Sequence, residues 1–427
     1  MNDEFINRSA GKKIVLPFFL FGAFFLLLFT VGLFFCSDEF SGHYFQPHLL
    51  ALVHVVILGF CTMIIFGALY QFLPVIAERP LYSRKLTVWT LILLLIGTLL
   101  LGYSFWTFNI GYVMQIAGII VLTSILLHTI NVLLTLKGAK STITLDCIST
   151  AHLWLLLTVI IGLLLVFNFQ FAFLPKDQLH YLGLHAHLGL IGWLLLLVIG
   201  VASKLIPMFM LAGGDYSKFI RFSYYTINIA LILFFADVLF THSYARAWLY
   251  VIIICSGLFG FAMMILRVRK NSVRKKTDEP MKQTFIAILF LLFPVLITLV
   301  RFLPLGIFNE SELINLTRIY GIALVPGFFI MLILGQTFKT LPFILWIDLK
   351  QKQLIPNKFM PRDLYNSKAV TVMVIVWNAG ILVLVLGNTF DLAWMNYFAT
   401  ALMTLSSLFY LLNILFMLRK GNHFEKK

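Results

Sequence analysis

The sequence predicts an all-α integral membrane protein of about twelve transmembrane helices, arranged as three pseudo-symmetric four-helix units. Three observations predict this fold. Of the 427 residues, 61% are hydrophobic and 11% are charged, whereas a soluble domain carries about 25% charged residues. Apolar runs of about 20 residues, which suffice to cross a hydrocarbon core of roughly 30 Å, recur along the whole chain. A spaced residue pattern also recurs three times, four runs apart.

The apolar runs are interpreted as helices in contact with the lipid bilayer. They lack the strict alternation of apolar and polar residues that is typical of barrel strands. The first run is too long for the hydrophobic region of a signal peptide and no small-residue cleavage site follows it, so we expect an uncleaved helix. The expected spans are 14–36, 48–76, 86–108, 110–136, 150–172, 181–210, 219–241, 246–268, 284–305, 315–346, 368–389 and 393–418.

Positive charge is distributed unevenly between the loops. The chain has 32 Lys and Arg residues and a net charge of +15. Cytoplasmic loops of membrane proteins are enriched in Lys and Arg, so we expect a multi-pass protein of the cell inner (cytoplasmic) membrane with both termini cytoplasmic. The same distribution argues against nucleic acid as a partner. Most cations lie at the termini and in the loops near 77–85, 137–149, 211–218, 267–283 and 347–368.

The threefold repeat is centred on the second, sixth and tenth expected spans. Four spans separate each copy from the next, which divides the single membrane domain 1–427 into units of about 1–140, 141–280 and 281–427. The glycines of the pattern are expected to let neighbouring helices approach closely. The matched residues are His54, Gly59, Phe60, Gly67 and Pro74; His187, Gly192, Trp193, Gly200 and Pro207; and Ile322, Gly327, Phe328, Gly335 and Pro342.

Histidine dominates the ionisable residues of the expected spans, and such residues indicate function inside a membrane. His54 and His187 occupy equivalent repeat positions and therefore similar depths. Because imidazole ligates haem iron and also suits copper, two such histidines could hold one iron from both faces. His185 points to nearly the opposite side of the helix from His187, which assigns it to a different site. His128 and His152 are expected to pack or bond locally.

A copper ion is the second metal that these histidines could bind. The cysteines show no paired spacing, so we assign them neither a disulfide nor a metal role. The candidate copper ligands are His48, His180 and His185. The four cysteines are Cys36, Cys61, Cys147 and Cys255.

Two of the repeated spans resemble a known superfamily. The second carries HVVILGF and FGALYQFLP, and the sixth carries HAHLGLIGW and IGVASKLIP. These segments resemble the haem–copper oxidase subunit I superfamily (cytochrome c oxidase subunit I-like). The HxH-x4-GW segment at 185–193 is most similar to a haem-ligand helix of the cytochrome-c-fed oxidases of the C family. It also resembles the NnrS family, haem- and copper-associated membrane proteins linked to nitric oxide stress. The resemblance implies twelve helices in three groups of four.

The chain departs from this family at the catalytic centre. The resemblance implies a copper held by a His on the sixth helix and a His pair on the seventh, and an HxH on the tenth. The seventh span, 219–241, has no His, and Tyr320 and Ile322 fill the positions equivalent to His185 and His187. The missing histidines argue against oxygen or nitric oxide reduction at a haem–copper centre, so no enzyme activity is assigned.

The resemblance and the repeat together predict a haem b with His54 and His187 as axial ligands. Arg301 and Arg318, near the outer ends of the ninth and tenth spans, are candidate partners of a haem propionate, because Arg recognises carboxylates with two hydrogen bonds. The predicted function is redox or nitric oxide/oxygen-related, with a respiratory-chain partner or cytochrome. The alternatives are a polytopic transporter and a cofactor-free accessory or assembly protein of a respiratory complex.

Overall fold

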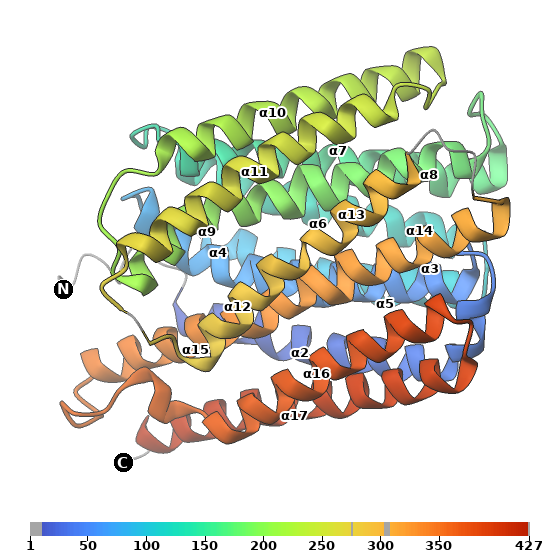
Figure 1. Ribbon diagram of the computed structural model, residues 1–427. Helices are drawn as coiled ribbons and strands as arrows, with labels where there is room; N and C mark the ends of the chain where they lie inside the picture. The colour runs from blue at the N-terminus through green and yellow to red at the C-terminus, as the bar shows by residue number, and fades with distance from the viewer. Residues whose placement is uncertain (1–10, 275, 303–307, 426–427) are drawn as a thin grey trace. The chain divides into compact units, whose positions relative to one another are not determined.

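The computed structural model describes residues 11–274, 276–302 and 308–425 (Figure 1). These residues contain twelve helical spans that are long and apolar enough to cross a membrane, which confirms the predicted all-α fold. Residues 303–305, at the end of the ninth expected span, lie outside the described residues. Most spans expose large apolar side chains, such as Phe240 and Trp394, as expected for helices in contact with lipid.

Nine of the spans consist of α-helix, in one case with a short π-helical end and in another with a break. They are α2 (Lys12–Phe35), α5 (Arg84–Trp106), α6 (Tyr112–Leu136), α7 (Ile143–Phe171), α10 (Ser217–Ala236) with η4 (Asp237–Thr241), α11 (Ala247–Asn271), α12 (Glu279–Phe290) with α13 (Leu292–Arg301), α16 (Ser367–Thr389) and α17 (Ala393–Glu425). The first loop contains the 3₁₀ turn η1 (Ser37–Ser41), and the loop before α16 contains η6 (Pro361–Leu364).

The second, sixth and tenth spans each change from α-helix to π-helix and back. The π turn has a wider hydrogen-bonded ring than the α turn and is frequently found at functional sites. In the second span, the Thr62 hydroxyl donates to the Ile57 carbonyl five residues earlier (2.7 Å). The three spans are α3 (Pro47–His54), η2 (Val55–Thr62) and α4 (Met63–Ile76); α8 (Gln178–His187), η3 (Leu188–Leu195) and α9 (Leu196–Met210); and α14 (Glu310–Leu324), η5 (Val325–Ile330) and α15 (Met331–Gln351).

Repeated glycines allow close packing of these three spans against the span before each of them. A Cβ atom added to Gly59 would lie 2.4 Å from the Phe25 ring of α2. The expected packing role of the glycines is therefore confirmed. The equivalent added Cβ atoms would lie 2.8 Å from Trp154 of α7 for Gly192, and 2.5 Å from Phe290 of α12 for Gly327.

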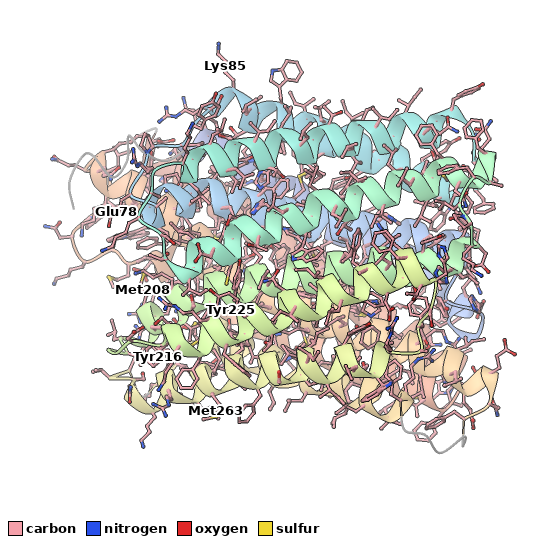
Figure 2. The ribbon with its side chains drawn as sticks, turned by 90° about the horizontal axis from the view of Figure 1, so that it is seen from above. Glu78, Lys85, Met208, Tyr216, Tyr225 and Met263 are labelled. Carbon is pink, nitrogen blue, oxygen red and sulfur yellow. The ribbon has the colours of Figure 1, made fainter. Side chains whose placement is uncertain are left out.

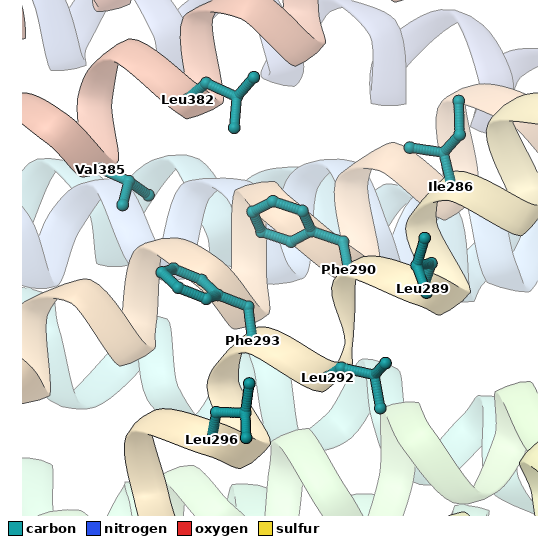
Figure 3. A pocket seen from close by; sticks show the side chains of 8 residues that line it. All are labelled: Ile286, Leu289, Phe290, Leu292, Phe293, Leu296, Leu382 and Val385. Carbon is teal, nitrogen blue, oxygen red and sulfur yellow. The ribbon is translucent and has the colours of Figure 1, made fainter. Parts of the chain in front are cut away.

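The ninth span is broken at Leu291, next to an apolar hollow. Pro294 lacks the N–H that would bond to the Phe290 carbonyl, and its ring crowds that carbonyl, so α12 ends and α13 begins there. The hollow, of about 370 Å³, has purely apolar walls that suit a hydrocarbon chain. Figure 3 shows its lining residues, Ile286, Leu289, Phe290, Leu292, Phe293, Leu296, Leu382 and Val385.

The described residues form two compact units. Unit 1 contains those within Met1–Phe72, Leu94–Asn109 and Asp278–Lys427. In Figure 1, α16 and α17 of this unit lie side by side. Hydroxyl groups join α17 to α2, with Thr30 Oγ1 2.7 Å from Ser407 Oγ. The beginning of α2 and the end of α17 meet at one end of unit 1, because Lys12 Nζ lies 2.6 Å from Asp348 and 2.5 Å from Glu425.

Unit 2 contains Leu73–Leu93 and Ile110–Thr277. Its helices α10 and α11 pack through small residues, and the Ser223 hydroxyl donates to the Gly257 carbonyl at 2.7 Å. Figure 2 shows Glu78, Met208 and Tyr216 at one end of this unit.

Candidate haem and metal ligands

His54 is the last residue of α3, directly before the π-helical stretch η2. Its Nδ1 lies 2.7 Å from the Leu50 carbonyl oxygen, one helical turn earlier. A carbonyl can only accept a hydrogen bond, so Nδ1 carries the proton and Nε2 carries the lone pair. The imidazole stacks on the Phe105 ring of α5, with ring centroids 4.7 Å apart. The main chain and this aromatic contact therefore fix both the tautomer and the orientation of the ring.

His187 has the same local arrangement in the sixth span. It is the last residue of α8 before η3, and its Nδ1 lies 2.7 Å from the Gly183 carbonyl oxygen. The Phe234 ring of α10 approaches edge-on, at a centroid distance of 6.0 Å. Metal-bound histidines commonly donate the N–H of their other ring nitrogen to a carbonyl. Both residues therefore have the chemistry of a haem ligand that binds through Nε2.

His54 belongs to unit 1 and His187 belongs to unit 2. The predicted ligation of one iron by both residues stays a prediction.

His185 is held differently from His187, as the two-residue spacing predicts. Its Nδ1 lies 3.0 Å from the Thr158 carbonyl oxygen of the neighbouring helix α7. Gly162 of α7 provides the space for the ring, because an added Cβ would lie 2.7 Å from His185 Cε1. His185 therefore packs against α7, whereas His187 bonds within its own helix.

The other two candidate copper ligands also have local partners. His180 Nε2 lies 3.4 Å from the Val238 carbonyl oxygen, and its ring contacts the Tyr244 ring at a centroid distance of 5.2 Å. His48, in unit 1, contacts the Glu39 carboxylate through Nδ1. The copper set of His48, His180 and His185 stays a prediction.

His128 and His152 bond to each other, which confirms the expected local role. Their Nε2 atoms are 3.0 Å apart, and both side chains are fully buried. His152 Nδ1 donates to the Ile148 carbonyl at 2.6 Å, so His152 Nε2 accepts the hydrogen bond from His128. The pair joins α6 to α7 within unit 2.

Arg301 and Arg318 differ in their surroundings. Arg301 is exposed, and its Nη1 lies 3.3 Å from the Leu313 carbonyl oxygen. Arg318 is partly buried and donates from Nη1 to the Gly42 carbonyl at 3.0 Å. The buried Nε of Arg318 has no hydrogen-bond partner among the described residues. Of the two candidates, Arg318 therefore has the free donor that an anion would satisfy.

The loop after α2 contains a ligand cluster that cysteine spacing does not reveal. Cys36, Glu39 and His48 each place a potential metal-binding atom within 4.8 Å of the other two. Burial, and secondarily the Glu39 carboxylate, raise the pKa of the Cys36 thiol to about 11, so the thiol is protonated at neutral pH. The C-x2-E spacing accounts for Cys36 and Glu39 only, because residues three apart lie on one face of a 3₁₀ turn, and it does not reveal His48.

Comparison with known proteins gives a distant similarity. No family model matches the chain. An alignment over 192 residues, which covers 41% of this chain, shows 30% identity to cytochrome c oxidase subunit 1 of Rhodobacter capsulatus. The chain covers 34% of that protein's length. The similarity and the twelve helical spans agree with a distant relation to that subunit.

Proposed function

We propose that this protein binds haem b in the membrane through His54 and His187 and transfers electrons. The observation that carries the proposal is the local geometry shared by these two histidines. Each ends an α-helix directly before a π-helical stretch and donates Nδ1–H to the carbonyl four residues earlier. The distant similarity to an oxidase subunit supports the same cofactor class.

The hydrogen bonds at Nδ1 suit the histidines to this role. Donation to a carbonyl raises the basicity of the imidazole and holds Nε2 as the ligating atom. Haem held by His54 and His187 would supply one-electron redox chemistry. A cytochrome or another respiratory-chain component is the corresponding electron-transfer partner, and copper at His185 would constitute a second site.

The transporter alternative has less support from the charged residues of the spans. Asp237 pairs with Arg246 and accepts a hydrogen bond from the Tyr250 hydroxyl at 2.6 Å. Lys339 pairs with Asp278. Charges that are already neutralised by neighbours are poorly placed to bind an ionic substrate without losing those partners.

The test is the visible spectrum of the full chain, expressed with ample haem precursor and purified in detergent. We expect a Soret band and the sharp reduced bands of low-spin haem, with little change on adding carbon monoxide. His54→Ala and His187→Ala should each remove one axial ligand and give high-spin or haem-free protein, because Ala preserves the helix.

Two variants provide controls for this experiment. His43→Ala alters a histidine in the first loop, and His185→Ala alters the histidine that bonds to α7. Both should retain the low-spin spectrum. Folded wild-type protein without a Soret band would exclude the proposal and favour the transporter or accessory alternatives.

A further inference from the structure

Three side chains of different ligand chemistry converge where the first two spans of unit 1 are joined. Cys36 follows α2, Glu39 lies in the 3₁₀ turn η1, and His48 lies in the first turn of α3. Their thiol, carboxylate and imidazole ligand atoms lie within 4.8 Å of one another. Ligands of a tetrahedral zinc ion are separated by roughly 3.3–3.8 Å, given bond lengths of about 2.0–2.3 Å. His48 Nδ1 and Glu39 Oε1 are in hydrogen-bond contact and lie closer than that spacing, so an ion bound by both atoms requires these two side chains to move apart.

The backbone that carries this cluster is held in place by other helices of unit 1. The Ser37 hydroxyl donates to the Leu33 carbonyl at 3.0 Å and contacts the Thr400 hydroxyl of α17. The Tyr397 hydroxyl, also of α17, donates to Asp38 at 2.6 Å. Ser37 and Asp38 lie between Cys36 and Glu39 in the sequence. The ligand positions are therefore preorganised, which reduces the ordering cost of binding an ion.

The bonding within the cluster leaves one buried atom unsatisfied. His48 Nδ1 contacts Glu39 Oε1, whereas the buried Glu39 Oε2 has no hydrogen-bond partner among the described residues. An unpaired buried carboxylate oxygen is costly. Cys36 is almost fully buried, and the His48 side chain is 38% exposed, so the cluster has a buried sulfur ligand and an opening to solvent at the imidazole.

We propose that Cys36, Glu39 and His48 bind a divalent transition-metal ion of the zinc class. The ligands are Cys36 Sγ, one Glu39 carboxylate oxygen and His48 Nδ1, with water in the fourth position. Binding releases the thiol proton to solvent and moves the imidazole proton from Nδ1 to Nε2. A thiolate with an imidazole favours zinc, cobalt or copper over calcium and magnesium, which prefer oxygen ligands. The bound ion would link the end of α2 to the beginning of α3.

Cobalt provides a direct probe of this site, because a Co²⁺–thiolate bond gives a charge-transfer band in the near ultraviolet. The purified full chain is stripped with a chelator and titrated with Co²⁺. We expect a saturable band that Zn²⁺ abolishes and excess Ca²⁺ leaves unchanged. Cys36→Ser should eliminate the band. Glu39→Gln and His48→Gln should weaken Co²⁺ binding by about 100-fold or more, since loss of an outer-shell partner alone costs 10–100-fold.

Matched controls separate this site from other thiols and imidazoles. Cys255→Ser and His43→Gln should retain the band at wild-type affinity. His54→Ala should also retain it, so failure of the haem proposal and failure of this one are distinguishable. Folded wild-type protein without the band, or an unchanged band in Cys36→Ser, would overturn the proposal. If Cys36→Ser does not fold, the test rests on Glu39→Gln and His48→Gln. Unchanged Co²⁺ affinity in both of these variants would also overturn the proposal.

Discussion

At the residue scale, the two candidate propionate ligands are distinguished by their hydrogen bonds. Arg318 uses Nη1 and Nη2 to bond Gly42 and Asn315, and its buried Nε lacks a partner among the described residues. A buried donor without a partner costs about 1–3 kcal/mol, which a carboxylate would relieve. Arg301 is exposed and bonds only weakly, at 3.3 Å to Leu313 and 3.4 Å to Thr317. Its replacement should have little effect.

If haem is bound as proposed, Arg318→Gln should accelerate haem loss to an acceptor protein by roughly tenfold, the equivalent of one charge-assisted hydrogen bond. The rate is measured from the Soret band. Arg301→Gln is the matched control and should change the rate less than twofold. If Arg318→Gln and Arg301→Gln changed the rate of haem loss equally, the unpaired Nε of Arg318 would not explain haem retention.

Sequence spacing predicts part of the candidate site. Equal repeat positions predict that His54 and His187 have equivalent surroundings, and both bond the carbonyl four residues earlier. The cluster of Cys36, Glu39 and His48 is not evident from spacing alone. It depends on a 3₁₀ turn and on a reversal of the chain between two spans, and neither is encoded by a periodic pattern.

At the element scale, the glycine pattern predicts the close helix packing, but not the π-helical stretches beside it. Gly59, Gly192 and Gly327 each face an aromatic ring of the preceding span. In lipid, the hydrophobic effect does not drive helices together. Small residues at the helix contacts allow the close van der Waals packing that stabilises the association instead. The π-helical stretches have uniformly apolar sequences such as VVILGFCT, and apolar residues by themselves do not distinguish an α turn from a π turn.

Gly327→Ala should lower the stability of the protein by about 1–3 kcal/mol, the usual cost of overpacking. The added Cβ would lie 2.5 Å from the Phe290 ring and 3.2 Å from the Ile322 carbonyl oxygen, and the carbonyl cannot move without disturbing the helix. Thermal unfolding in detergent measures the change. Gly321→Ala, in the same span with nothing within 4 Å of the added Cβ, should be neutral or stabilising. A loss of stability in Gly321→Ala as large as in Gly327→Ala would contradict this explanation.

At the scale of the whole molecule, composition predicts the twelve helical spans because backbone polar groups in lipid must be satisfied within each segment. The observed bounds of a helix differ from the expected ones where its polar ends extend beyond the apolar run. The tenth span, for example, is expected at 315–346 and observed at Glu310–Gln351. The break at Leu291 depends on the local effect of Pro294. The three four-helix units are defined by a repeated sequence pattern. The two compact units are defined by contacts between residues, so the two divisions of the chain need not coincide.

The orientation predicted from the basic loops can be tested with single cysteines. Val273, which is 75% exposed, is the labelling position in the basic loop, and the exposed Glu310 probes the opposite end of the ninth span. The neighbouring Ser272 is unsuitable, because it is buried and its hydroxyl donates to the Met210 carbonyl at 2.7 Å. Cys255→Ser removes the native thiol that is not buried.

In intact cells, a membrane-impermeant maleimide should label Glu310→Cys from outside. It should label Val273→Cys only after permeabilisation, because Lys and Arg concentrate in cytoplasmic loops. The ion pair of Lys12 and Glu425 places the beginning of α2 and the end of α17 at the same end of unit 1, and an even number of spans requires both termini on one side. Labelling of Val273→Cys but not Glu310→Cys in intact cells would invert the orientation, and with it the side on which Cys36, Glu39 and His48 meet solvent.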